Sequence, residues 1–303
     1  MSKVINLDAN LTKSQQKEVV KAWKLQLAKL QQPLREAGIP VIVMFEGFSG
    51  AGKGSIIGDV IAELDPRQYT VHTVPKATEA EERMPFLAPF WHKLPPRGEM
   101  AIFDHSWYNR TLSLSKKEQA RARASIALFE RQLADDGYLI LKFFLHISGK
   151  EQAKRLKALE SDPATAWRVD NKDWRQNRKR DKFTETYQSM MDQTNQPYAP
   201  WHTIDNETQR FGTIQVLSTI CTAVEQAMES GIASTAGGPT MEVFPLPVPD
   251  LEDVSLEYQQ DAFSYEQELK AEREQLHQLH SALYLHKIPV ILAFEGWDAA
   301  GKG

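Results

Sequence analysis

A short apolar run that leads directly into a glycine-rich loop constrains the fold of this chain more than any other stretch. Val41–Phe45 is apolar and rich in β-branched residues, as expected for a buried strand. The sequence GFSGAGKG follows at Gly47–Gly54 and has the GxxxxGK spacing of a phosphate-binding loop. In such loops the glycines let backbone N–H groups point at phosphate oxygens, and the lysine and the next helix add positive charge. The spacing therefore predicts a phosphate-binding loop followed by a helix from Lys53.

The predicted loop has one unusual position. Its candidate residues are Gly47, Ser49, Gly50, Ala51, Gly52, Lys53, Gly54 and Ser55. Gly54 stands where Ser or Thr normally helps to hold magnesium. A glycine-rich turn without a ligand would show the same local pattern, but the strand before it and the helix-compatible run after it favour the phosphate-binding loop.

The loop and its strand occur twice. Ile39–Gly54 reads IPVIVMFEGFSGAGKG and Ile288–Gly303 reads IPVILAFEGWDAAGKG, with eleven of sixteen positions identical. Identity that runs through the strand as well as the loop indicates an internal duplication. We expect a first copy at 1–230, a Pro/Gly-rich linker at 231–262 and the start of a second copy at 263–303. The second loop would include Asp298, Gly301 and Lys302.

Composition narrows the class of protein. A net charge of −4 argues against general nucleic-acid binding, and Phe211–Leu269 contains no Lys or Arg at all. The single cysteine, Cys221, fits a reducing compartment and is expected in the core. No signal peptide or membrane-length apolar run is evident, so we expect a cytoplasmic protein with no membrane partner. We also expect a homo-oligomer.

Strand-like and helix-like runs alternate along the first copy. Predicted strands are Val41–Phe45, Tyr69–Val74, Glu99–Asp104, Tyr138–His146 and Trp201–Ile204, and predicted helices include Leu11–Ala37, Lys53–Leu64, Lys116–Asp136, Lys150–Glu160 and Thr208–Glu229. His105–Arg110 is expected to form a turn. This alternation predicts an α/β domain with a mostly parallel five-stranded sheet, whose ligands sit beyond the carboxyl ends of the strands.

Two charged residues near one strand end are typical of phosphoryl transfer. Asp104 ends an apolar strand, as a Walker-B-type carboxylate that holds magnesium does. A helix N-cap is the alternative role for such an aspartate. Arg110 follows one turn later and could clamp a phosphoryl group, while Lys53 would neutralise it.

A strongly basic segment follows the fourth predicted strand. Its seven cations are Arg168, Lys172, Arg175, Arg178, Lys179, Arg180 and Lys182. A solvated helix face would have this composition, but beside a phosphate-binding loop a mobile basic lid over a polyanion is the better interpretation. Trp167 and Trp174, interleaved with these cations, are expected to pack rather than stack on bases.

Taken together, the motifs resemble those of the type-2 polyphosphate kinases. The matching stretches are FEGFSGAGKG (Phe45–Gly54), VPKATEAE (Val74–Glu81), IFDHSWYNR (Ile102–Arg110), DPATAWRV (Asp162–Val169) and PWHTIDN (Pro200–Asn206). The similarity extends in order from about Leu25 to Cys221, and the duplication resembles the fused, two-copy members of the family.

The resemblance implies a P-loop kinase-like, three-layer α/β/α fold with a basic helical lid. It also implies Mg²⁺-dependent phosphoryl transfer from inorganic polyphosphate to a nucleotide, typically AMP to give ADP. The catalytic residues would be Lys53, Asp104 (also the Mg²⁺ ligand) and Arg110, with Lys76, Thr78, Glu79, Arg83 and Asn109 on the nucleotide side.

Two positions depart from the family pattern. Ser49 replaces an aspartate that the second copy keeps as Asp298, and His105 replaces an arginine. A serine cannot carry the charge of a carboxylate, and a histidine at neutral pH is mostly uncharged. A weakened first copy that serves as a structural or polyphosphate-binding domain therefore stays open, as does, less favourably, an ATP-dependent nucleoside monophosphate kinase.

Overall fold

The first compact unit, Met1–Met241, is built around one parallel sheet. The computed structural model describes residues 12–112, 114–240, 247, 250–253, 261–298 and 300. Within them, five strands form a single sheet in the order β2-β3-β1-β4-β5, and every neighbouring pair is parallel. The strands are β1 (Val41–Gly47), β2 (Tyr69–Thr73), β3 (Met100–Asp104), β4 (Leu139–His146) and β5 (Trp201–Asp205).

Strand register brings the functional ends together. β1 is buried along its whole length and lies between β3 and β4, which explains its continuous apolar sequence. Phe45 pairs with Asp104 of β3 and with Phe143 of β4. Because all strands run in one direction, the loops that follow β1 and β3 meet at one edge of the sheet.

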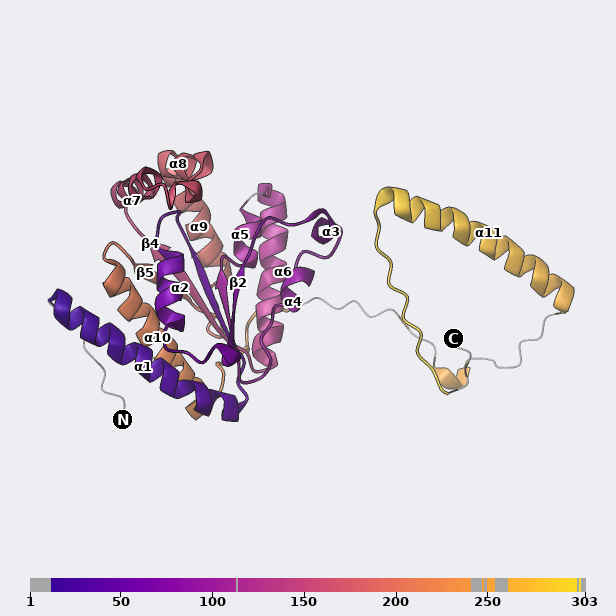
Figure 1. The fold of residues 1–303 in the computed structure, drawn as a ribbon. Coiled ribbons are helices and arrows are strands. Elements are labelled where there is room, and N and C mark those ends of the chain that lie inside the picture. Colours follow the sequence, from indigo (N-terminus) through magenta and orange to yellow (C-terminus); the bar gives the residue numbers. More distant parts are fainter. Residues whose placement is uncertain are drawn as a thin grey trace. The chain divides into compact units, whose positions relative to one another are not determined.

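Helices cover both faces of the sheet (Figure 1). On one side, α1 and α2 pack with α10, and on the other α6 packs with α5 and α9. α7 and α8 stand beyond the carboxyl ends of the strands. The helices longer than five residues in this unit are α1 (Lys13–Ala37), α2 (Lys53–Ile61), α6 (Lys116–Asp135), α7 (Gly149–Ser161), α8 (Asn171–Arg178), α9 (Arg180–Thr194) and α10 (Gln209–Ser230). Shorter helices are α3 (Glu79–Glu82), α4 (Ala88–Trp91) and α5 (Trp107–Thr111), with 3₁₀ turns at Pro66–Gln68 and Ala166–Arg168.

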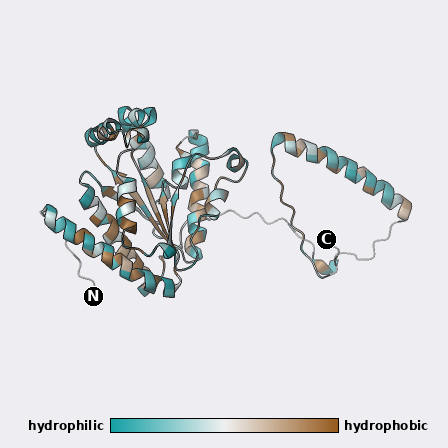
Figure 2. Ribbon diagram, viewed as in Figure 1, coloured by the Kyte–Doolittle hydropathy of each residue, from teal (hydrophilic) through white to brown (hydrophobic). Residues whose placement is uncertain are grey.

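Apolar residues gather between the layers, whereas the outer faces and α7 and α8 are hydrophilic (Figure 2). Cys221 lies in this core, and its burial raises the pKa of the thiol to about 12. None of the helices in the described part of the chain has both the length and the apolar run needed to cross a bilayer. The prediction of a three-layer α/β fold with a parallel five-stranded sheet is therefore confirmed.

Predicted element bounds mostly agree with the structure to within one or two residues, and the exceptions have local causes. The predicted turn at His105–Arg110 is wrong, because Ser106 caps a short helix, α5. The predicted packing of Trp167 is also wrong, since its side chain is 76% exposed.

The second compact unit is Glu242–Gly303. It contains a 3₁₀ turn at Leu251–Asp253 and α11 (Ala262–His286), which Asp261 caps and which has no buried residue. Residues 288–298, which repeat the sequence of the first strand and loop, form no strand. This is expected, because a lone strand lacks a neighbour to complete its hydrogen-bond ladder.

Candidate functional site

The predicted phosphate-binding loop has a backbone that only glycine tolerates at its first position. Gly47 has a φ of 141°, and a Cβ there would lie 2.4 Å from the carbonyl oxygen of Leu145. Gly50 and Gly52 also have positive φ angles, of 73° and 92°. Lys53 is the first residue of α2, so its charge and the positive end of the helix act at the same place.

An open cavity of about 890 Å³ joins this loop to the end of β3. We call it the loop cavity. It brings together Lys53 and Asp104, two of the three predicted catalytic residues. Its lining residues are Ser49, Gly50, Gly52, Lys53, Gly54, Ser55, Asp104, His105, Glu151, Arg155, Leu156, Ala158, Leu159, Arg168, Asp173 and Gln209.

Asp104, the last residue of β3, has one carboxylate oxygen buried without a hydrogen-bond partner. Its Oδ1 atom is buried and has no hydrogen-bond donor among the described residues. It is not a helix N-cap, because the N-cap of α5 is Ser106, whose Oγ accepts the N–H of Tyr108. In the described residues no three His, Cys, Asp or Glu side chains form a metal cluster. A cation here would take further ligands from phosphate and water, as Mg²⁺ commonly does.

A buried glutamate shapes the turn after Asp104. Glu46, the sixth residue of β1, is 1% exposed. Its Oε1 accepts both the N–H and the hydroxyl of Ser106 at 2.8 Å, and its Oε2 lies 3.0 Å from Nδ1 of His105. His105 has a φ of 62°, an uncommon conformation for a residue with a side chain. The contacts of Glu46 hold this strained turn and so fix the position of Asp104.

Two glutamines connect the phosphate-binding loop to α7 and α8. The N–H of Ser49 donates to Oε1 of Gln176 on α8 at 2.7 Å. Nε2 of Gln152 on α7 donates to the carbonyl of Ser49 at 3.1 Å and to Gln176 at 3.0 Å. Gln176 in turn donates to the hydroxyl of Tyr187 on α9. The middle of the loop is thus bound by side chains from α7 and α8, and Tyr187 of α9 supports Gln176.

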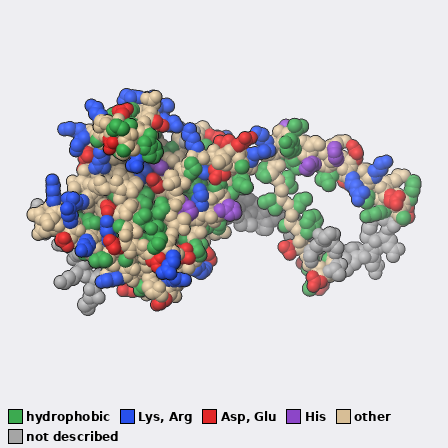
Figure 3. Space-filling view, in the orientation of Figure 1, with side chains coloured by type: hydrophobic (Ala, Val, Ile, Leu, Met, Phe, Trp, Pro, Cys, Tyr) green, Lys and Arg blue, Asp and Glu red, His purple; other side chains and the backbone are tan. Residues whose placement is uncertain are grey.

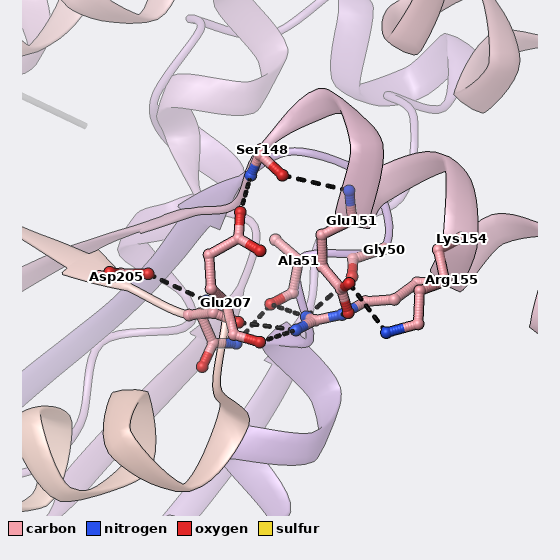
Figure 4. Close-up of polar contacts among 9 residues, drawn as sticks. Gly50, Ala51, Ser148, Glu151, Lys154, Arg155, Asp205 and Glu207 are labelled. Carbon is pink, nitrogen blue, oxygen red and sulfur yellow. Dashed lines mark hydrogen bonds and ion pairs between the residues drawn. The ribbon is translucent and has the colours of Figure 1, made fainter. Parts of the chain in front are cut away.

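Arg155 of α7 joins the loop to the β5–α10 connection (Figure 4). Its guanidinium donates to the carbonyls of Gly50 and Ala51 at 3.4 Å, and to those of Asn206 and Glu207 at 2.7 and 3.1 Å. Glu151 accepts from its Nε at 2.9 Å. This arginine therefore holds three separate segments at the rim of the loop cavity.

Lys and Arg side chains gather over α7 and α8 (Figure 3). Of the seven predicted lid cations, Arg168 lines the loop cavity, and its guanidinium lies 5.2 Å from the ring centre of Trp167. Lys172 lies beside Lys76 of the loop after β2, and this neighbouring ammonium lowers the pKa of Lys76. Lys172, Arg175, Arg178, Lys179 and Lys182 are exposed. Two adjacent ammonium groups on facing segments favour an anion between them.

Arg180 behaves differently from the other lid cations. Its guanidinium lies 3.9 Å from the ring centre of Phe48 and donates to Oε1 of Gln152 and to the carbonyl of Ile147. Burial lowers the pKa of this side chain. The structure therefore gives Arg180 a packing role at the start of α9.

The residues predicted for the nucleotide side lie on α3, α5 and the loop before α3. Thr78 caps α3 through a reciprocal pair of hydrogen bonds with Glu81. Arg110 donates to Glu81 at 2.9 Å and lies 4.9 Å from the ring centre of Phe90. The hydrogen bond from Thr78, and then the charge of Arg110, lower the pKa of Glu81. Arg110 does not line the loop cavity, and neither does any residue predicted for the nucleotide side. These are Lys76, Thr78, Glu79, Arg83 and Asn109.

A buried ion pair supports α5 from behind. Lys142 of β4 and Glu130 of α6 are 2.7 Å apart and fully buried. Tyr108 of α5 donates to Glu130 at 2.7 Å, as does Trp107 at 3.0 Å. Because a buried charge left without its partner is costly, this network fixes the position of the helix that carries Asn109 and Arg110.

Several supporting residues were not identified by their sequence. Glu46 could have been found as the one charge in an otherwise apolar strand, but Gln152, Arg155 and Gln176 lie on ordinary polar helix faces. In the second copy, Asp298 is exposed, whereas Gly301 and Lys302 lie outside the described residues.

Known proteins are similar to this chain in sequence and in fold. The family model for polyphosphate kinase 2 matches residues 10–231. A polyphosphate:AMP phosphotransferase of Pseudomonas aeruginosa is 34% identical over 229 residues, covering 74% of this chain and 46% of the relative. A GDP-polyphosphate phosphotransferase of Mycobacterium tuberculosis is 28% identical over 209 residues, covering 67% of this chain and 70% of the relative.

A solved structure of polyphosphate kinase 2 from Arthrobacter aurescens superposes with a TM-score of 0.68 at 25% identity, over 74% of this chain and 87% of that one. The chain spans about half the length of the polyphosphate:AMP phosphotransferases that it matches. The family model covers most of the chain, including the loop cavity, and the shared fold agrees with it. The chain belongs to the polyphosphate kinase 2 family.

Proposed function

We propose that this protein transfers a phosphoryl group from inorganic polyphosphate to a nucleotide, with AMP as the acceptor and ADP as the product. The observation that carries the proposal is the loop cavity, where Lys53 at the end of a phosphate-binding loop shares one space with the unpartnered carboxylate of Asp104. Two relatives, a polyphosphate:AMP phosphotransferase and a GDP-polyphosphate phosphotransferase, support polyphosphate as the second substrate.

Phosphoryl transfer needs positioning and charge neutralisation more than covalent chemistry. The backbone N–H groups of the loop and the ammonium of Lys53 would hold the transferring phosphoryl group, and Arg168 would add charge from the lid. The exposed lid cations suit a polyanionic donor, and Lys76 and Lys172 would attract a further phosphate. Arg110, which lies outside the loop cavity, would act on the acceptor side.

A magnesium ion fits the site. The buried Oδ1 of Asp104 is an oxygen ligand of the kind that Mg²⁺ prefers, and the substrate phosphates would complete its shell. When bound, the ion would neutralise charge that develops on the phosphate oxygens. Gly54 offers no hydroxyl at the usual second position.

A weakened catalyst that chiefly binds polyphosphate is the second candidate. Two observations favour it: the Ser49 amide is engaged by Gln176, and His105 lies against Glu46. We expect that Ser49→Asp with His105→Arg raises the rate of AMP phosphorylation at least about tenfold if these positions limit the reaction. A double variant that folds, binds polyphosphate and stays as slow as the parent would exclude them as the cause.

The chain also fits the start of a two-copy protein. The repeated segment at Ile288–Gly303 and the coverage of about half of each phosphotransferase support this organisation. We propose that residues 1–230 form the first copy and that residues 263–303 belong to a second.

The deciding experiment compares donors. AMP is offered with Mg²⁺ and either polyphosphate or ATP, and ADP formation is measured for the parent and for Lys53→Ala. Transfer from polyphosphate that falls about a hundredfold or more in Lys53→Ala supports the proposal. Transfer from ATP alone would show a nucleoside monophosphate kinase, and binding of polyphosphate without transfer would show the binding domain.

A further inference from the structure

A second cavity, of about 820 Å³, lies where the first turns of α1 and α10 meet. We call it the α1–α10 cavity. Its lining includes Lys13 and Lys17, one turn apart on α1, and Arg210 in the first turn of α10. No sequence motif marks it, and the proposed transfer reaction does not use it.

The charge of the α1–α10 cavity suits an anion. In the described residues Lys13, Lys17 and Arg210 form no ion pair. Neither α1 nor α10 has an acidic residue in its first turn, and the N-cap of α10, Thr208, makes no side-chain capping bond. Two long helices therefore direct the positive ends of their dipoles toward three unpaired cations.

Two carboxylates also line this cavity, but each is held by a partner. Asp59 lies 2.6 Å from the ammonium of Lys24 and accepts from the hydroxyl of Thr213. Glu207 accepts the N–H of Ser148 at the start of α7 (Figure 4). Asp59 is paired with Lys24, whereas Glu207, bonded to a backbone N–H, keeps its charge and offsets one of the three cations, so the lining retains an excess of positive charge.

The two cavities share a wall. Gln209 lines both the α1–α10 cavity and the loop cavity. The connection before it is tied to the phosphate-binding loop, because Asn206 donates to the carbonyl of Ala51 and Arg155 bridges the same segments. An anion that ends at the phosphate-binding loop and passes Gln209 would meet the first turn of α10 and then Lys13 and Lys17.

We propose that the α1–α10 cavity binds the distal phosphates of a polyphosphate chain whose reacting end lies at the phosphate-binding loop. The inference rests on the proposed function and adds a subsite that only long donors reach. A short donor such as tripolyphosphate occupies the loop cavity alone, whereas a long chain also gains the contacts with Lys13, Lys17 and Arg210.

The test compares long-chain polyphosphate with tripolyphosphate as donors to AMP, in the full chain. For Lys13→Ala/Lys17→Ala/Arg210→Ala we expect KM for the long donor to rise about tenfold, with kcat unchanged, and its dependence on salt to weaken. KM for tripolyphosphate should stay within about twofold. The control Lys29→Ala/Lys116→Ala/Lys117→Ala removes the same charge from exposed positions that line neither cavity, and should leave both donors unaffected.

Arg210 is half-buried, so the double variant Lys13→Ala/Lys17→Ala, at two exposed positions, covers the case in which the triple variant does not fold. We expect a rise of about threefold in KM for the long donor alone. An unchanged KM, or equal losses with both donors, would overturn the proposed subsite.

Equilibrium binding separates this inference from the proposed function. If the parent transfers no phosphoryl group, titration calorimetry with the same two polyphosphates still decides the matter. If the parent binds the long polyphosphate more tightly than tripolyphosphate and the variants do not, the subsite is supported even though the transfer proposal has failed. Equal affinities of parent and variants, or no binding, would overturn it.

Discussion

At the residue scale, replacing two glycines of the phosphate-binding loop by alanine should have different effects on the free energy of unfolding. Gly47→Ala places a Cβ 2.4 Å from the carbonyl of Leu145 in a strained backbone, so the free energy of unfolding should fall by at least about 2 kcal/mol. Gly54→Ala meets no atom within 4 Å inside a helix and should change it by less than about 1 kcal/mol. Urea unfolding of both variants checks this pair, and equal effects would contradict the loop geometry.

Glu46 gives a second prediction at this scale. Glu46→Gln keeps the shape of the side chain but replaces one acceptor oxygen by a donor, which faces Ser106 or His105. We expect a loss of about 1–2 kcal/mol in the free energy of unfolding, because the contacts with Ser106 and His105 lose the charge of the carboxylate acceptor. Glu36→Gln, on the exposed face of α1, is the control and should change it by less than about 0.5 kcal/mol. Similar values for the two variants would show that Glu46 does not hold the turn.

Sequence patterns identified the site residues that belong to a common motif. They missed the residues whose role depends on contacts formed only in the folded protein. The spacing GxxxxGK identifies Lys53, and the end of an apolar strand identifies Asp104, because both follow directly from chain order. The contacts of Gln152 and Gln176 with Ser49 join segments more than a hundred residues apart. No local pattern encodes such a pairing, since glutamine on a helix face is ordinarily a solvated residue.

At the element scale, both edge strands carry a histidine whose ring lies against an inner strand. His72 of β2 lies 5.0 Å from the ring of Phe103, and His202 of β5 lies 5.4 Å from that of Phe143. Burial lowers the pKa of each, helped by the charge of Lys93 for His72 and of Lys142 for His202. The neutral form of both histidines is therefore favoured in the folded protein.

These histidines predict how stability depends on pH. At a pH below the ordinary pKa of 6.5 the unfolded chain binds more protons than the folded protein. The free energy of unfolding therefore falls as the pH drops from 6.5 through the lowered pKa values of the two histidines. Above pH 6.5 their full contribution to stability is present. His202→Leu should reduce this slope and, because Nε2 of His202 has no partner in the described chain, should lose no hydrogen bond. Urea unfolding across this pH range measures both slopes, and identical slopes in parent and variant would contradict the assignment.

Helices and strands were predicted well where the apolar residues follow a single helical period or form one continuous run. The alternation of buried strands and amphipathic helices gave the sheet and its parallel direction. α5 was missed because it has only five residues and begins with bulky aromatic side chains, whose burial against α6 and β4 depends on the folded protein. For α11 the helical pattern of the sequence did yield a helix, but one without a buried residue.

At the scale of the whole molecule, the two compact units differ in how they treat apolar side chains. The first encloses its core, whereas α11 and the segment after it leave large apolar groups exposed. These are Phe263, Tyr265, Leu276, Leu279, Tyr284, Leu285, Ile288, Val290, Ile291, Leu292, Phe294 and Trp297. Exposed apolar surface of this extent favours association between molecules.

We therefore expect removal of residues 242–303 to change association but not the folding of the first unit. Sedimentation at increasing concentration should show assembly of the full chain and much weaker assembly of the truncated one. The midpoint of thermal unfolding for the first unit should stay within about 2 °C, since its core and loop cavity lie within Met1–Met241. Full-length and truncated chains that remain monomeric to the same concentration would contradict the role of the exposed residues, and a large drop in the midpoint would show that the first unit depends on the second.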